Sequence, residues 1–290
     1  MLRAILLLLG LAMASAPALA QADLAALRQA AEAGDPDAAF DYGYELTFPE
    51  TGDPDPVTGR YWLSRAADAG NPSASYVMGL IHLDGIGTDP DPQAARPFFR
   101  QAWAAGDAPA GLMLAEILLY DTDDGEAQAR TILEALLANE DVGALARLTL
   151  ADSLFFPGSG LPADRPRAVQ LASEALSMDP GLGEAHYLLG IAAMEGIGRP
   201  ADPAAALAHW REGARGGDTY AMTALADTLA DGAAGDPDPV EAQALYASAA
   251  ALGDAEAETL ARDLAAALTP QQQTEAQRRR DAWLAELGGG

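Results

Sequence analysis

The chain of 290 residues contains no cysteine, and all 17 of its basic residues are arginine because lysine is absent as well. Without cysteine there can be no disulfide, no lipid anchor attached to a thiol and no thiol nucleophile. Without lysine there can be no Schiff base and no Ser-x-x-Lys nucleophile. The hydrophobic core alone must therefore hold the fold, which a chain of this length can do.

Histidine is almost as scarce, and its three copies do not form a recognisable metal motif. His82, His186 and His209 have no second histidine three or four residues away, so the sequence contains no His-Glu-x-x-His zinc motif. We expect each to be a separate helix residue. Gly158–Gly160 lacks the flanks of a nucleophile elbow. The sequence predicts no enzyme, with no catalytic residue, metal or cofactor.

Basic residues are few relative to acidic ones, since 43 aspartates and glutamates leave a net charge of −26. Such a chain is repelled by nucleic-acid phosphates and by anionic membrane surfaces. The composition favours a partner with a basic surface or a cationic ligand. The alternative is that the acidity only maintains solubility.

Long apolar runs are confined to the first 20 residues. Arg3 supplies a short positive start, Ile5 to Leu11 are apolar, and Ala18–Ala20 has the small-x-small pattern of a cleavage site. This pattern is typical of a secretory signal peptide and is too short for a membrane span. We expect cleavage after Ala20, a periplasmic or secreted protein, and no membrane insertion after signal cleavage.

What the chain does contain is a repeat of about 36 residues. Gly34, Gly70 and Gly106 are 36 apart, as are Gly217 and Gly253, and 111 residues between Gly106 and Gly217 leave room for three more units. A period of this size indicates stacked helix pairs, an all-α solenoid.

Aspartates in the same register predict where the helices begin, because a carboxylate can accept the orphan backbone N–H groups of a first turn. The aspartates are Asp55, Asp91, Asp124, Asp164, Asp202 and Asp238. Asn139 replaces the glycine that ends the helix after Asp124, and asparagine tolerates the left-handed conformation expected there. Asp238 and Glu241 also match a capping box.

The same aspartates leave one chemical alternative open. Asp53/Asp55, Asp89/Asp91 and Asp236/Asp238 form Asp-Pro-Asp-Pro loops, and paired carboxylates can bind a hard cation such as calcium. The loops lack the glycine and final glutamate of an EF-hand. We expect capping rather than calcium binding.

Aromatic and small residues mark the helix faces that pack together. The predicted inward positions of the second helices are Trp62, Phe98, Phe99, Leu171, Trp210, Leu245 and Tyr246. A ladder of glycine or alanine through the first helices, including Gly43, Gly79 and Gly190, predicts close helix crossings, since glycine inside a helix costs about 1 kcal/mol relative to alanine. Phe40, Tyr76 and Tyr187 recur at core positions.

This pattern of Ala, aromatic, Leu-Gly, a Gly-x-Gly loop, then Asp, Ala and Ala-Ala resembles the Sel1-like repeat family, which is related to tetratricopeptide repeats. The clearest units are residues 74–106 and 185–217, and the two units between 107 and 179 are degenerate. The resemblance implies a solenoid of about six helix pairs with terminal capping helices. We expect the solenoid over 21–268 and a capping helix with a frayed tail over 269–290.

The resemblance also implies a non-catalytic scaffold that binds a protein or peptide on its concave face, which first helices line in related solenoids. The expected contacts are acidic residues between the core positions, which should be solvated, and two tyrosines near first-helix ends. They are Asp41, Tyr44, Glu45, Glu116, Tyr120, Asp152 and Asp227. The alternative function is a periplasmic protein that binds or hydrolyses glycans with an acidic groove.

Overall fold

The computed structural model describes residues 21–120, 125–158 and 162–288, and all regular structure within these ranges is helical. The all-α prediction is confirmed. The predicted signal peptide, Asp124 and Ser159-Gly160 lie outside the described residues. No helix among the described ranges combines the length and the apolar composition needed to cross a membrane.

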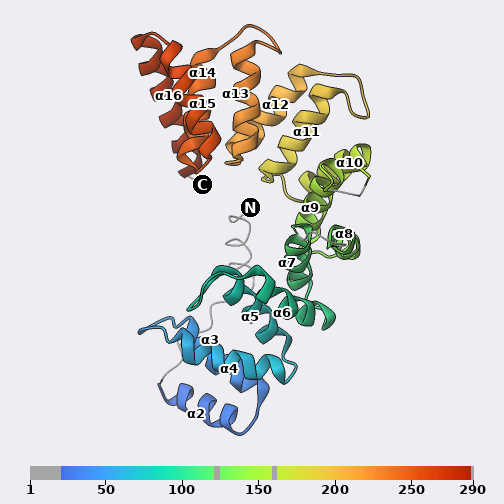
Figure 1. Ribbon diagram of the computed structural model, residues 1–290, viewed down its shortest axis with the longest axis vertical. Helices are drawn as coiled ribbons and strands as arrows, with labels where there is room; N and C mark the ends of the chain where they lie inside the picture. The colour runs from blue at the N-terminus through green and yellow to red at the C-terminus, as the bar shows by residue number, and fades with distance from the viewer. Residues whose placement is uncertain (1–20, 121–124, 159–161, 289–290) are drawn as a thin grey trace. The chain divides into compact units, whose positions relative to one another are not determined.

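Six helix pairs follow one another along the chain, as the repeat predicts (Figure 1). They are α3 (Pro36–Thr47) with α4 (Pro56–Asp68), α5 (Pro72–Asp84) with α6 (Pro92–Ala104), α7 (Ala108–Leu119) with α8 (Gly125–Leu136), α9 (Gly143–Phe155) with α10 (Arg165–Met178), α11 (Gly183–Glu195) with α12 (Pro203–Arg215), and α13 (Thr219–Asp231) with α14 (Pro239–Ala251). The flanking helices are α2 (Gln21–Glu32), α15 (Ala255–Ala267) and α16 (Pro270–Gly288).

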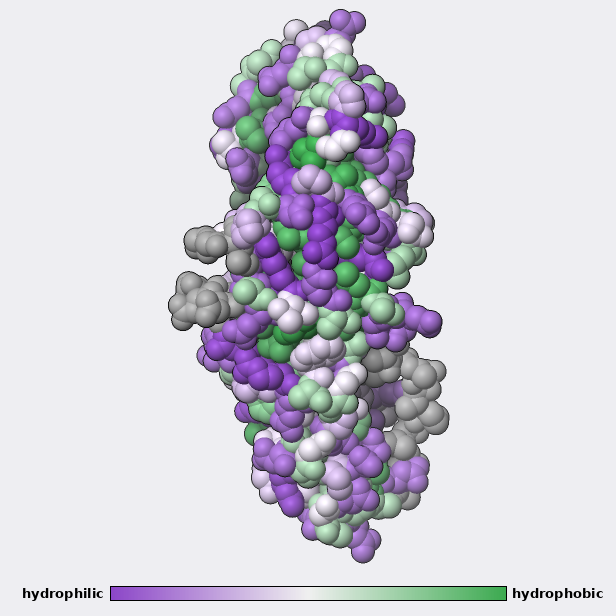
Figure 2. All heavy atoms as spheres, turned by 90° about the vertical axis from the view of Figure 1, so that its right-hand side faces the viewer, coloured by the Kyte–Doolittle hydropathy of each residue, from purple (hydrophilic) through white to green (hydrophobic). Residues whose placement is uncertain are grey.

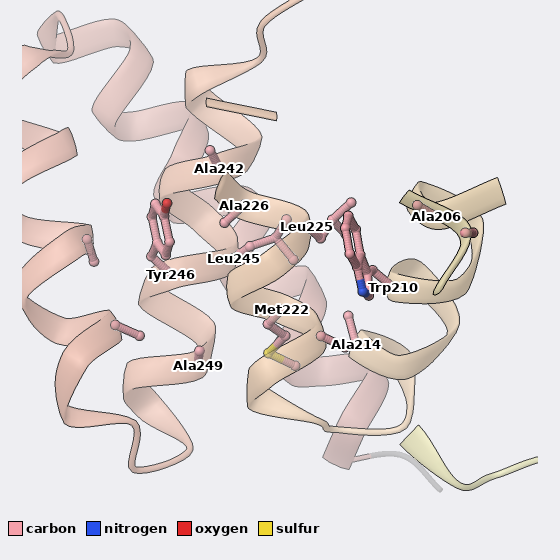
Figure 3. Packing of buried hydrophobic residues seen from close by; sticks show 14 residues of the cluster. Ala206, Trp210, Ala214, Met222, Leu225, Ala226, Ala242, Leu245, Tyr246 and Ala249 are labelled. Atoms are coloured by element: carbon pink, nitrogen blue, oxygen red, sulfur yellow. The ribbon is translucent and has the colours of Figure 1, made fainter. Parts of the chain in front are cut away.

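The helices divide into two compact units, with the boundary between Val142 and Gly143. Unit 1 contains α2–α8, and its core includes Trp62, Leu63 and Ile81. Unit 2 contains α9–α16, and its core centres on Trp210, Leu225 and neighbouring side chains of α12, α13 and α14 (Figure 3).

The register aspartates begin the helices as predicted. Asp55, Asp91, Asp164, Asp202 and Asp238 are each the N-cap of a second helix, with a side-chain oxygen that accepts a backbone N–H of the first turn. Asp35, Asn71, Asp107, Asp218 and Asp254 do the same for first helices. Each such cap stabilises its helix by about 1 kcal/mol.

The glycines at the 36-residue spacing end the second helices. Gly70 and Gly253 have φ angles of 92° and 101°, which side chains other than glycine rarely adopt. The prediction that Asn139 adopts this left-handed conformation is wrong, since no non-glycine residue among the described ones has a positive φ. The Asn139 side chain instead accepts the backbone N–H groups of Asp141 and Val142, both at 2.9 Å. It therefore shapes the entry to α9.

The glycine ladder brings helices into close contact, as predicted. A Cβ atom on Gly43 would lie 2.8 Å from the carbonyl oxygen of Gly59, so the backbones of α3 and α4 nearly touch there. At Gly190 of α11 a Cβ atom would lie 2.1 Å from Nε1 of Trp210. That indole group also donates a hydrogen bond to the carbonyl of Tyr187 at 3.2 Å. The ring of Trp210 therefore occupies the space that the missing side chain leaves.

Replacement of Gly190 with alanine should lower the free energy of unfolding by about 1–3 kcal/mol, because the added methyl group displaces the buried indole and its hydrogen bond. Gly181→Ala is the matched control, since a Cβ atom there would meet only the Asp179 carboxylate, at 3.3 Å. Urea denaturation measures both. An equal effect at the two positions would contradict the close packing described above.

The terminal helix α16 is anchored to α14 by one arginine and one tryptophan. Nη1 of Arg279 lies 3.0 Å from both Asp238 and Glu241, and its Nε lies 3.0 Å from Glu275. Trp283 donates to the second oxygen of Glu241 at 2.9 Å. The predicted capping box is therefore formed only in part: Asp238 accepts the N–H of Glu241, but the Glu241 side chain contacts α16.

Arg279→Ala should lower the free energy of unfolding of unit 2 by about 1–2 kcal/mol, because it leaves carboxylates of two helices without their shared cation. Arg278→Ala is the control. Arg278 is 74% exposed and binds only Glu275 in the same helix, so its loss should change the stability much less. Thermal denaturation measures both variants. Equal melting temperatures of the two variants would contradict this role of Arg279.

Candidate interaction surface

The first helices of unit 2 lie on the inner side of its curve. Helix α11 packs against both α9 and α13, whereas α10, α12 and α14 make no comparable contacts with one another; α14 packs instead on the terminal helix α16. In a solenoid, the helices on the concave side lie closer to one another than the helices on the convex side do. The concave side is the usual binding surface of such folds.

Tyrosine and aspartate side chains meet on these first helices. The ring of Tyr187 in α11 lies 5.6 Å from that of Tyr220 in α13, measured between centroids. Burial raises the pKa of the Tyr187 hydroxyl, and the charges of Asp218, Asp152 and Asp227 raise it further. We call these five residues the unit 2 acidic surface.

Two of its carboxylates are poorly hydrated. Burial raises the pKa of Asp152 and of Asp218, although Asp218 also accepts the backbone N–H of Ala221. Asp227 is exposed and accepts a hydrogen bond from the Tyr246 hydroxyl. A desolvated carboxylate is stabilised when a cation approaches it, so this surface should attract a partner's positive groups.

Unit 1 has a similar arrangement around Tyr76 in α5. Burial raises the pKa of Tyr76 to about 12, with further contributions from the charges of Asp107, Asp84 and Glu116. Burial also raises the pKa of Glu116 to about 7. Each unit therefore presents a tyrosine hydroxyl among carboxylates.

The sequence predicted that the acidic contact residues would be solvated, and this is correct for only some of them. Asp41 and Asp227 are exposed as expected, whereas Glu45, Glu116 and Asp152 are half-buried, which corrects the prediction.

The two predicted tyrosines differ from one another. Tyr44 is half-buried between Phe40 and Phe48, at ring-centroid distances of 5.8 and 5.1 Å, so it contributes to packing. Tyr120 is 66% exposed at the end of α7. Of the residues predicted as contacts, the structure groups Asp152 with Asp227, whereas the other five belong to unit 1.

Sequence reasoning missed Tyr187 and Tyr220. Tyr187 was predicted as core from its register, yet its hydroxyl needs a polar surrounding that a phenylalanine at the same register does not need. A tyrosine at a repeat position where Phe40 stands in the first unit was the signal that could have identified this surface.

The Asp-Pro-Asp-Pro loops are explained by helix capping, which Asp55, Asp91 and Asp238 perform. Among residues 21–120, 125–158 and 162–288, no group of three or more histidine, aspartate or glutamate side chains is arranged to hold a metal ion.

Comparison with known proteins agrees with the repeat architecture. The Sel1 repeat profile matches residues 36–71, 72–107, 144–180, 183–218 and 219–254, which is more than half of the chain. The chain belongs to the Sel1 repeat family. The pair α7–α8 lies between the matched segments, as expected from its degenerate sequence, yet it folds as a helix pair. The other unit described as degenerate does match the profile, over residues 144–180.

Two crystal structures illustrate the relationship of this Sel1 repeat protein to solved folds. One is a protective antigen of uropathogenic Escherichia coli strains with an SLR fold, with a TM-score of 0.72 and 22% identity over 91% of this chain and 56% of that one. The other is a Sel1 repeat protein from Oxalobacter formigenes, with a TM-score of 0.61 and 26% identity over 76% and 89%. This chain thus spans little more than half the length of the antigen. Comparison with curated proteins finds no match.

Proposed function

We propose that this protein is a non-catalytic interaction scaffold outside the cytoplasm that binds a protein or peptide with a basic surface. The observation that carries the proposal is the unit 2 acidic surface, in which Tyr187 and Tyr220 stand among three aspartates on consecutive first helices. The location rests on residues 1–20, whose sequence is typical of a cleavable signal peptide.

Arginine on the partner is the group that this surface suits best. A guanidinium can stack on a tyrosine ring and donate paired hydrogen bonds to a carboxylate at the same time. The poorly hydrated Asp152 and Asp218 lose little water on binding, which favours such a pair. In the view of Figure 2, polar side chains cover most of the surface, and apolar side chains are visible between them.

The alternative function is the binding or hydrolysis of glycans. No arrangement among the described residues favours it over protein binding. A screen of the full chain against cell-wall glycans, run beside capture of proteins from an envelope extract, separates the two. Release of sugar fragments would overturn the scaffold proposal.

Replacement of Tyr220 with alanine should weaken binding of the captured and purified partner at least about 10-fold, because exposed tyrosines at binding surfaces often carry much of the affinity. Tyr61→Ala is the matched control. Tyr220 is 60% exposed on a first helix, and Tyr61 is 57% exposed on the second helix α4. Calorimetric titration measures both. Equal loss, or no loss, in the two variants would contradict the proposed surface.

A further inference from the structure

Two histidines that are 23 residues apart meet between α11 and α12. Nδ1 of His186 lies 3.2 Å from Nδ1 of His209, and the ring centroids lie 5.5 Å apart. The two nitrogens face each other, so one neutral ring donates a hydrogen bond to the other. The same 23-residue offset joins Tyr187 to Trp210, whose indole donates to the Tyr187 carbonyl at 3.2 Å. Two hydrogen bonds from consecutive residues therefore connect these helices.

The rings are confined because α11 and α12 approach each other closely beside them. A Cβ atom on Gly213 would lie 3.4 Å from the Cβ atom of His186 and 3.0 Å from the carbonyl oxygen of Gly183. Both histidine side chains are half-buried at this crossing. A change in the contact between the rings should therefore be transmitted to the packing of the two helices.

Protonation affects this contact differently at its two steps. The first proton leaves a donor on one ring and an acceptor on the other, so the hydrogen bond persists. The second proton places the N–H groups of two cations against each other, and like charges at this distance repel. We propose that His186 and His209 form a pH-sensitive latch, which holds α11 to α12 while at least one ring is neutral and opens when both are protonated.

The surroundings keep the latch closed at neutral pH. Burial lowers the pKa of His186 and of His209, so both rings are neutral there. Glu212 and a hydrogen bond with the backbone of Pro180 raise the pKa of His186, but less than burial lowers it. The other histidine and Arg199 lower the pKa of His209 further. Because the folded chain then binds fewer protons than the unfolded chain, unit 2 should lose stability as the pH falls below about 6.5.

Carboxylates on the elements next to the pair do not remove the repulsion of the second proton. Glu212 of α12 is held by Arg215 at 2.5 Å. Asp218 caps α13, and Asp179 in the loop before α11 accepts a backbone N–H. Glu184 of α11 is exposed. None of these groups can lie between two nitrogens that are 3.2 Å apart.

Helices α9, α10 and α16 also pack against α11 or α12. Glu174 of α10 pairs with Arg147 of α9 at 3.2 Å. Asp152 of α9 raises the pKa of Tyr187 rather than that of a histidine, and Glu286 of α16 is exposed. The response of the pair to pH is therefore set mainly by burial and by the contact between the rings.

The latch adjoins the unit 2 acidic surface. His186 precedes Tyr187, whose ring belongs to that surface and whose carbonyl accepts the Trp210 indole. Opening of the latch should therefore displace Tyr187 and weaken partner binding at low pH. This consequence rests on the proposed function, whereas the latch itself does not. Failure to find a basic partner would contradict the proposed function but not the latch, which can be tested in the free chain.

Nuclear magnetic resonance of the imidazole nitrogens, from pH 8 to pH 4.5, tests the latch in the unmodified chain. We expect His186 and His209 to titrate in two coupled steps, with the second well below pH 6.5. His82 should titrate in one step, because it stacks on Phe98, at a centroid distance of 5.4 Å, without a second histidine. Independent titration of the two rings, or uptake of only one proton by the pair down to pH 4.5, would overturn the proposal.

Hydrogen–deuterium exchange at pH 7.5 and at a pH below the second step shows whether the helices loosen. Protection factors correct for the effect of pH on intrinsic exchange. In α11 and α12 we expect them to fall at least about 10-fold more in the unmodified chain than in His209→Gln, which cannot acquire two facing charges. The matched control is His82→Gln, which replaces another half-buried histidine and should respond like the unmodified chain. An equal fall in the unmodified chain and in His209→Gln would overturn the latch.

Discussion

Replacement of Trp210 with alanine should lower the free energy of unfolding of unit 2 by about 3–5 kcal/mol, as removal of a large buried side chain does. Trp210 is 4% exposed and lies among Leu225, Met222 and the alanines of α12 (Figure 3). Its ring also fills the space over Gly190. The variant leaves a cavity that rigid helices cannot close. Denaturant unfolding followed by circular dichroism measures the loss.

Trp283→Ala is the control for this prediction. Trp283 is a tryptophan of the same unit, but it is only half-buried and lies on the terminal helix α16, where its indole donates to Glu241. Its loss should cost less than half as much. Trp62→Ala in unit 1 should behave like Trp210→Ala, because Trp62 is also buried, with 7% of its surface exposed. An unchanged denaturation midpoint for Trp62→Ala or Trp210→Ala would contradict the inward face assigned to the second helices.

Removal of three charges from the unit 2 acidic surface should slow association with a basic partner about 10-fold or more at low salt, since electrostatic attraction acts mainly on the encounter. The variant carries Asp152→Asn, Asp218→Asn and Asp227→Asn. Asp218→Asn keeps the helix cap, because Asn71 caps α5 at the corresponding position and accepts the N–H of Ala74 at 2.8 Å.

The matched control removes the same number of charges elsewhere in unit 2, through Asp236→Asn, Glu258→Gln and Asp263→Asn, all exposed. Its association rate should change much less. Stopped-flow measurements give the association rates at rising salt concentration. The rates of the variant, the control and the unmodified chain should become similar near 1 M salt, where the screening length is about 3 Å. An association rate that does not depend on salt would contradict a role of the unit 2 acidic surface in binding.

The repeat architecture could be predicted from sequence because its signals are local. A capping aspartate and a helix-ending glycine act within one turn of themselves, so Asp91 and Gly70 identify helix ends without knowledge of the rest of the fold. The period then brings equivalent positions into contact, which is why the enclosed Trp62 and Trp210 were also predicted.

The remaining features depend on contacts that no local pattern shows. Glu241 matched a capping box, but its carboxylate binds Arg279 and Trp283 of a helix some 40 residues away. His186 and His209 were expected to be separate, yet their Nδ1 atoms lie 3.2 Å apart across α11 and α12, a contact that no local motif shows. Asn139 was predicted to adopt a left-handed conformation by analogy with glycine. Its side chain instead accepts a hydrogen bond from the backbone N–H of Asp141.

Hydrogen–deuterium exchange of the full chain, alone and with its purified partner, is the measurement that tests the central claim most directly. The account predicts slower exchange on binding in the first helices α9, α11 and α13, with little change in α10, α12 and α14. Protection confined to the second helices, or bound partner without any protection of the first helices, would contradict it.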